Sequence, residues 1–194
     1  ITTKSDRLLR DIDLLSDMAR DNLVGVAISV TTLDPHLART LEPRAPHPKR
    51  RLAAIRALID AGGPTQVNVS PIIPAITDHE IEAIMAAAAQ AGAIRASYIL
   101  MRLPFEVAPL FRAWLAAHYP DRADKVMHMV QDIRGGRDND AGFFTRMKGQ
   151  GVWAQLIRSR VKRAAREHGL DRRFPPLRSD LFRPPERDGQ MELF

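Results

Sequence analysis

The chain has 194 residues, of which 45% are apolar and 27% charged, with a formal net charge of +6 and no cysteine. This composition excludes disordered and fibrous proteins, no run approaches the ~18 uncharged apolar residues of a membrane helix, and the first residues lack the pattern of a secretory signal. The lack of cysteine excludes disulfides, thiolate zinc sites and cysteine nucleophiles within this sequence, and it suits the reducing cytoplasm, where we expect the protein.

Strand and helix patterns alternate from the first residue. A short strand ends at Thr3-Lys4-Ser5, and the β-branched residues 23–33 predict a strand buried on both faces of a parallel sheet. Residues 34–48 contain four prolines and predict a loop. Helical spacing of apolar residues predicts a helix before and a helix after residues 23–48. These apolar residues are Leu8, Leu9, Ile12, Leu15 and Met18 in the first helix and Leu52, Ile55, Leu58 and Ile59 in the second.

Two further strands follow, at 65–73 and 94–103. Because proline cannot donate to a strand ladder, Pro71 and Pro74 are expected at or beyond the end of the first of these strands. Between the strands, Thr77 and Glu80 predict a capping box for an Ala-rich helix over 78–91. Alternating strands and helices with short turns predict βα units and a parallel sheet.

After Pro104 the pattern is helical, over 105–118, 121–134 and 152–168. We expect three regions: a partial barrel over 1–104, a helical region over 105–170, and a Pro/Arg-rich flexible tail over 171–194. Four strands cannot close a (β/α) barrel, which needs about eight. An open four-stranded sheet is one alternative. Because the chain begins in a strand and without Met, we favour half of a larger barrel.

Polar residues end several of the predicted strands, where α/β folds bind ligands. Lys4 ends an apolar strand, and a cation there suits a carboxylate or phosphate. Ser29 lies between Ile28 and Val30, so its hydroxyl needs a partner if it is buried. A backbone partner for Ser29 is the simplest alternative to a ligand role.

The positive charge is concentrated in the C-terminal part of the chain. Residues 122–194 hold 16 Lys and Arg against 10 Asp and Glu, whereas the preceding residues balance. A basic surplus at one end favours a polyanion-facing surface, and nucleic acid is the expected partner. The alternative is a solvated basic helix without a partner.

Several blocks, in order, resemble the radical S-adenosylmethionine (radical SAM) superfamily and, more narrowly, its branch of DNA repair photolyases near spore photoproduct lyase. They are ITTKS (1–5), RDIDLL (10–15), VAISVTTLD (26–34), LEPRAPHPKRRLAAI (41–55), AG (61–62), SPIIPAITD (70–78), RLP (102–104), RGGR (134–137) and RMKGQG (146–151).

The resemblance implies a partial (β/α)6 TIM-like barrel, of which this chain is the C-terminal half. It also implies two cofactors, SAM and a [4Fe–4S] cluster, which together yield a 5′-deoxyadenosyl radical. Lys4 matches a lysine that contacts the SAM carboxylate, and Ser29 matches a serine that binds its amino-acid part. Thr31 stands near the cofactor, and Ser70 lies on the strand expected to flank the adenosine.

The family's CxxxCxxC motif is absent, since the sequence contains no cysteine. We therefore expect this chain to be the C-terminal portion of a larger radical SAM enzyme that acts on nucleic acid as a DNA repair lyase, with an electron donor as a further partner. The portion alone should be inactive. The alternative is a nucleic-acid-binding or clamp-interacting protein without a cluster.

The last five residues, QMELF, are similar to the short peptide that binds the bacterial DNA polymerase sliding clamp. Such a peptide inserts Leu193 and Phe194 into an apolar pocket while Gln190 makes polar contacts. The alternative is a terminus that packs its own Leu-Phe pair.

Overall fold

The computed structural model describes residues 1–143 and 145–183. Its centre is a four-stranded parallel sheet in the order β1-β2-β3-β4. The strands are β1 (Thr2–Thr3), β2 (Val26–Ser29), β3 (Thr65–Ile72) and β4 (Arg95–Leu100). Strand order follows chain order, as expected for consecutive βα units. The expectation of a mixed α/β fold built on a parallel sheet is confirmed, and the sheet is consistent with part of a TIM-like barrel.

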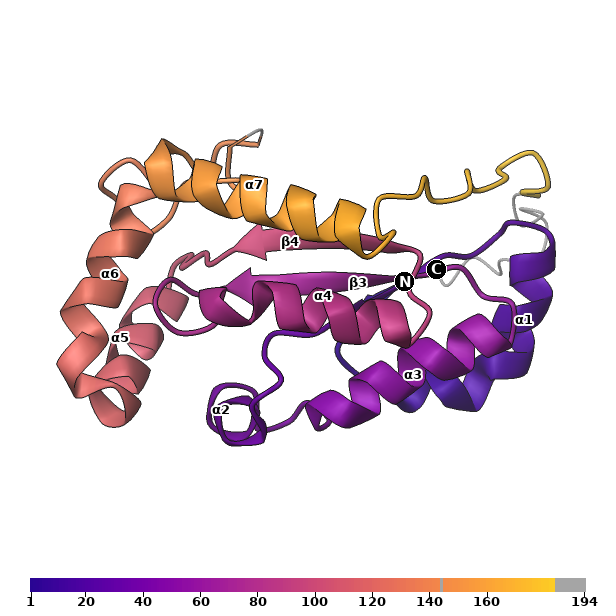
Figure 1. Ribbon diagram of the computed structural model, residues 1–194, viewed down its shortest axis with the longest axis horizontal. Coiled ribbons are helices and arrows are strands. Elements are labelled where there is room, and N and C mark those ends of the chain that lie inside the picture. The colour runs from indigo at the N-terminus through magenta and orange to yellow at the C-terminus, as the bar shows by residue number, and fades with distance from the viewer. Residues whose placement is uncertain (144, 184–194) are drawn as a thin grey trace, which may run out of the picture.

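Helices cover one face of the sheet and both of its ends (Figure 1). In Figure 1, α3 and α4 lie in front of the sheet, α7 runs along β4, and α5 and α6 stand beyond the carboxyl ends of β3 and β4. The α-helices are α1 (Ile12–Arg20), α2 (Pro35–Leu41), α3 (Pro48–Asp60), α4 (Ile81–Gln90), α5 (Val107–His118), α6 (Ala123–Asp132) and α7 (Gly151–Glu167). Short 3₁₀ turns lie at η1 (Arg7–Asp11), η2 (Asp78–Glu80) and η3 (Pro120–Arg122).

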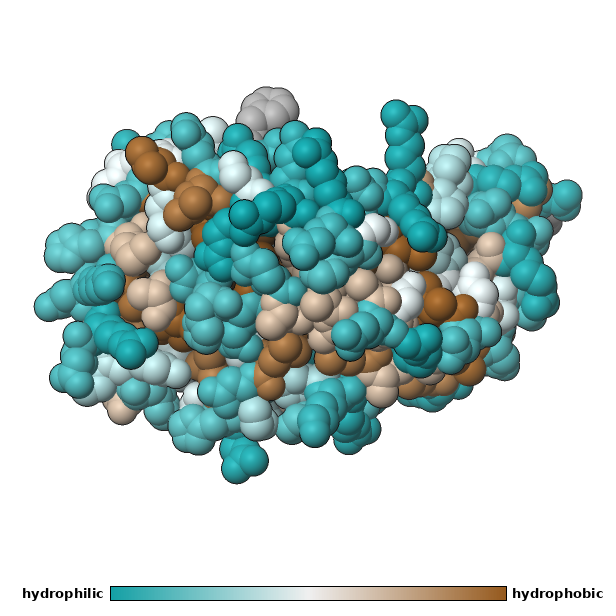
Figure 2. All heavy atoms as spheres, in the orientation of Figure 1, coloured by the Kyte–Doolittle hydropathy of each residue, from teal (hydrophilic) through white to brown (hydrophobic). Residues whose placement is uncertain are grey.

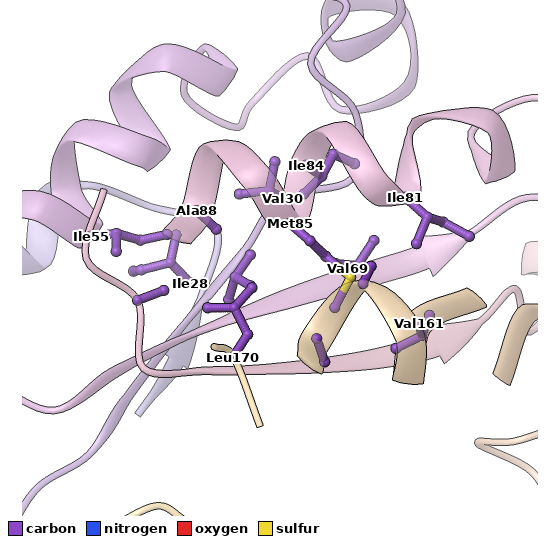
Figure 3. Close-up of a cluster of buried hydrophobic side chains, with 14 of the residues drawn as sticks. Ile28, Val30, Ile55, Val69, Ile81, Ile84, Met85, Ala88, Val161 and Leu170 are labelled. Carbon is purple, nitrogen blue, oxygen red and sulfur yellow. The ribbon is translucent and has the colours of Figure 1, made fainter. Parts of the chain in front are cut away.

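The main core lies between the sheet and α1, α3, α4 and α7. Figure 3 shows side chains of the sheet, among them Ile28 and Val69, meeting side chains of α3, α4 and α7. Ile55 of α3 and Ile84 of α4 are fully buried there. Burying each such side chain stabilises the fold by roughly 1.5–3 kcal/mol. Since Val161 of α7 belongs to the same cluster, α7 packs back on the sheet although it follows β4 by some fifty residues.

A second core cluster fastens α5 and α6 near the carboxyl ends of the strands. Phe111 and Leu115 of α5 and Val126 of α6 are buried in it together with Leu37 of α2. The indole nitrogen of Trp114 donates to the Thr40 carbonyl at 3.1 Å. These contacts hold α2 beside α5. In the part of the chain that the structure describes, no helix combines the length and apolar character needed to cross a bilayer.

Three local expectations were wrong. The predicted loop over 34–48 contains α2, because Asp34 caps a helix whose first residue is Pro35. The capping box does not form, since the Glu80 carboxylate accepts from the Thr32 hydroxyl and from the Leu33 N–H instead. Pro71 lies within β3, at an irregularity between Val69 and Ile72 where the register to β4 shifts. There the ladder is already interrupted, so the missing N–H is tolerated.

Candidate functional site

One face of the sheet carries a row of polar side chains. Ser29 of β2 lies opposite Asn68 of β3, and Asn68 lies opposite Ser97 of β4. The Asn68 amide donates to the Ser29 hydroxyl at 3.4 Å and accepts from the Ser97 hydroxyl at 3.2 Å. Because side chains alternate along a strand, this polar row faces away from the core that holds Ile28 and Val67. The partner of the Ser29 hydroxyl is therefore a side chain of the neighbouring strand rather than the backbone.

Glu42, in the segment after α2, joins the carboxyl ends of three strands. Its carboxylate forms ion pairs with the Lys4 ammonium after β1 and with the Arg51 guanidinium at 2.7 Å. The Thr31 hydroxyl lies 2.8 Å from Glu42 Oε1 and 2.9 Å from the Ser70 carbonyl oxygen of β3. Glu42 thereby connects the segments that follow β1 and β2 to β3.

Arg51 supports this network from the first turns of α3. Its guanidinium donates to the Ser29 carbonyl at 3.2 Å and to the Pro46 carbonyl at 2.9 Å, in addition to Glu42. The Arg51 side chain is 2% exposed and that of Glu42 10% exposed, whereas the Lys4 side chain is 38% exposed. Lys4 is therefore the member of the network that a ligand can reach.

The network of Lys4, Arg51 and Glu42 has a net charge of +1. Burial of Glu42 opposes its ionisation, but hydrogen bonding and charge attraction from Lys4 and Arg51 outweigh that effect and hold the pKa of the Glu42 carboxyl below its ordinary value. Two cations thus surround one carboxylate. Since an ammonium has three donors, Lys4 can bind Glu42 and a further anion together. The network is suited to receive an anionic group at the carboxyl edge of the sheet.

The residues that the sequence singled out come together here. Lys4 and Thr31 both contact Glu42, Thr31 contacts the Ser70 backbone, and the Ser29 carbonyl reaches Glu42 through Arg51. Gln190, Leu193 and Phe194 lie outside the described residues. Within residues 1–143 and 145–183, no group of three or more His, Asp or Glu is placed to hold a metal ion.

Sequence reasoning assigned no role to Glu42, Arg51 or Asn68. One signal was present for Arg51, because it shares the helical spacing of the buried Ile55 and Leu58 on α3. A charged residue in an apolar stripe needs a buried partner. Which carboxylate would serve was not visible, because Glu42 lies in a segment that the proline count predicted to be a loop.

Residues 1–88 of the chain match the family model of the radical SAM superfamily. All members of the network around Glu42 fall within the matched residues. The narrower likeness to spore photoproduct lyase rests on the sequence blocks alone.

Three relatives show how far the similarity extends. An uncharacterized protein of Mycobacterium tuberculosis is 34% identical over 133 residues, which are 68% of this chain and 39% of that protein. An uncharacterized protein of Acidianus two-tailed virus is 39% identical over 74 residues, 38% of this chain and 24% of its own length. One of Methanocaldococcus jannaschii is 32% identical over 80 residues, 41% and 30% of the two chains. The chain therefore spans about two fifths or less of the relatives it matches.

Proposed function

We propose that this chain is the part of a radical SAM enzyme that holds the amino-acid end of SAM. The half-exposed Lys4 ammonium binds the cofactor's carboxylate, and Ser29 contributes its hydroxyl to the amino-acid part. Thr31 stands near the cofactor, and Ser70 lies on the strand expected to flank the adenosine. The observation that carries the proposal is the surplus cation of the Lys4–Glu42–Arg51 network at the carboxyl edge of a parallel sheet, within residues that match the family model.

The donor set fits SAM and does not fit the cluster. The SAM carboxylate complements Lys4, while Glu42 and Arg51 hold Lys4 in place. When bound beside a reduced [4Fe–4S] cluster, SAM supplies a 5′-deoxyadenosyl radical for hydrogen abstraction. Fe–S clusters are held by cysteine thiolates, and the 194 residues contain none, so these residues do not hold the cluster. We infer that the ligands come from outside this sequence and that the chain alone does not turn over.

We further propose that the complete enzyme acts on nucleic acid, in the manner of a DNA repair lyase. The support is the basic surplus of residues 122–194 and the exposed Arg and Lys side chains along α7. A nucleic-acid-binding protein without SAM chemistry is the second candidate, favoured by the same charges. The two candidates differ in whether the chain binds SAM.

Calorimetric titration of the 194-residue chain with SAM tests the first proposal. Replacing Lys4 with Met should weaken SAM binding at least tenfold, because a hydrogen bond to a charged group contributes about 1.5–3 kcal/mol. The matched control is Lys125→Met, which removes an exposed lysine of α6 outside the network. A wild-type chain that binds no SAM, or a Lys4→Met chain that binds it as tightly as the control, refutes the assignment.

A partner beyond the substrate is proposed from the sequence of the last residues. Gln190, Leu193 and Phe194 supply the polar and apolar contacts of a sliding-clamp-binding peptide. Such a contact would recruit the enzyme to replicating DNA, where lesions are met.

A further inference from the structure

A basic groove runs between the edge strand β4 and α7. The cavity has a volume of about 650 Å³ and is bounded by β4, residues 147–148, α7 and residues 170–173. Its floor is apolar and is formed by Ala96, Val161, Ala165 and Leu170. Its rim carries six cations, Arg95, Lys148, Arg158, Lys162, Arg172 and Arg173, against the single carboxylate of Asp171.

The cations of this rim have no acidic partners in the described part of the chain. All six side chains belong to exposed residues, and none forms an ion pair within 4.0 Å among residues 1–143 and 145–183. The opposite side of α7 differs, because Arg160 binds Glu82 of α4 through two hydrogen bonds of 2.8 and 2.6 Å. On α7, the charge of Arg160 is thus neutralised where the helix packs against α4, whereas Arg158 and Lys162 beside the groove have no acidic partner among the described residues.

Uncompensated like charge around one cavity destabilises the folded chain by self-repulsion. A bound polyanion removes that repulsion. Arg158 and Lys162 are four residues apart, so they lie on the same face of α7, one turn from each other. Arg172 and Arg173 extend the cations past the end of α7. The cations therefore form a line rather than a single cluster. Figure 2 shows hydrophilic side chains over the middle of α7 and hydrophobic ones over its first turns, where Val152 and Leu156 are exposed.

The groove also follows the open edge of β4. The Ala96 N–H donates to the Leu170 carbonyl at 2.8 Å, and the Leu100 N–H donates to the Met147 carbonyl at 3.4 Å. Tyr98 lies between the two residues of β4 that form these hydrogen bonds, and it lines the groove. At its far end the groove passes Met147, whose sulfur contacts Arg102 just beyond β4. A chain laid in the groove is thus led along β4 toward the carboxyl ends of the strands, the same end of the sheet on which the Lys4–Glu42 network lies, near the opposite edge strand β1.

We infer that this groove binds the phosphodiester backbone of single-stranded nucleic acid. A line of cations over an apolar floor matches a repeating anion that carries apolar bases, as in known single-strand grooves. A phosphopeptide offers too few phosphates for six separated cations, and a lipid surface cannot enter a concave cavity of this size. A duplex fits less well, because its bases are stacked inside it and cannot contact the apolar floor. The biological role of the groove rests on the proposed action on nucleic acid, but the binding itself requires neither SAM nor a cluster.

The test is fluorescence anisotropy of the 194-residue chain with a labelled 12-nucleotide single strand, between 50 and 300 mM salt and without SAM. The test variant is Arg158→Ala with Lys162→Ala. Loss of two phosphate contacts should lower the slope of log K against log salt by about 1.4 and weaken binding about tenfold at 0.15 M salt. The control is Arg44→Ala with Lys49→Ala, which removes the same charge at two exposed residues outside the groove and outside α7 and should bind like wild type.

Four outcomes overturn the inference. The first two are a test variant that binds like wild type and a control that loses as much affinity as the test variant. The third is tighter binding of the matching duplex than of the single strand. The fourth is binding of anionic phosphatidylserine vesicles that depends on Arg158 and Lys162 while the oligonucleotide is not bound. The calorimetric SAM titration is read separately. A chain that binds the oligonucleotide through the groove but no SAM refutes the proposed enzyme function and leaves the groove assignment intact.

Discussion

Replacing Glu42 with Gln removes the one negative charge of the network and keeps its shape. Breaking a buried ion pair by removing one partner costs about 3–5 kcal/mol, because the other charge stays buried. Arg51 is the charge left behind, with its side chain 2% exposed. It keeps the carbonyl oxygens of Ser29 and Pro46 as acceptors, so we expect the lower end, about 3 kcal/mol. With a urea slope of about 2 kcal/mol/M, the unfolding midpoint should fall by about 1.5 M.

The same variant predicts a pH dependence. The folded-state pKa of Glu42 lies below its ordinary value of 4.5. Above pH 4.5 the carboxyl is ionised in both the folded and the unfolded chain, so its full stabilisation is present. As the pH falls below 4.5 toward the folded-state pKa, the unfolded chain takes up the proton first, and the stabilisation is lost. The stability gap between wild type and Glu42→Gln should be constant from pH 7 to pH 5 and shrink below 4.5.

Urea unfolding followed by circular dichroism at several pH values measures both effects. The control is Asp17→Asn, which breaks an ion pair to Arg20 whose side chains are 66% and 70% exposed. Exposed pairs contribute little, so its free energy of unfolding should change by less than about 0.5 kcal/mol. A Glu42→Gln loss below about 1 kcal/mol, or a gap that does not shrink on acidification, would refute the role given to the network.

Two further predictions concern other parts of the chain. Ile84→Ala in α4 should lower the free energy of unfolding by about 3 kcal/mol, because it opens a cavity in the fully buried cluster of Figure 3, whereas Leu156→Ala on the exposed side of α7 should change it by less than about 0.5 kcal/mol in the same urea assay. Deleting residues 190–194 should abolish binding to an immobilised bacterial sliding clamp, measured by surface plasmon resonance, and leave the oligonucleotide affinity of the groove unchanged; clamp binding that survives the deletion, or that the intact chain lacks, refutes this partner.

The periodicity of the sequence alone was enough for the parallel βα order. Residues 23–33 are rich in β-branched side chains and uncharged, and the apolar spacing of Ile55 and Leu58 is helical, so element type follows from local pattern. Because α/β folds bind ligands at the carboxyl ends of their strands, the sequence also indicated Lys4 and Ser29 as site residues before any contact was known. Local pattern failed where a side chain had more than one possible hydrogen-bond partner. Asp34 caps a helix inside a segment predicted to be a loop, and Glu80 accepts from Thr32 instead of capping α4.

Only the tertiary structure decided which distant residues meet. Lys4 and Glu42 are 38 positions apart, and Glu82 and Arg160 are 78 apart. No periodic pattern specifies such pairs, because they depend on how α2 and the segment after it, and α7, are placed against the rest of the fold. The basic groove has the same origin, since its rim combines β4, α7 and the segments on either side of α7. The sequence determined that the chain carries surplus positive charge, and the packing of α7 along β4 gathered part of that charge around one cavity.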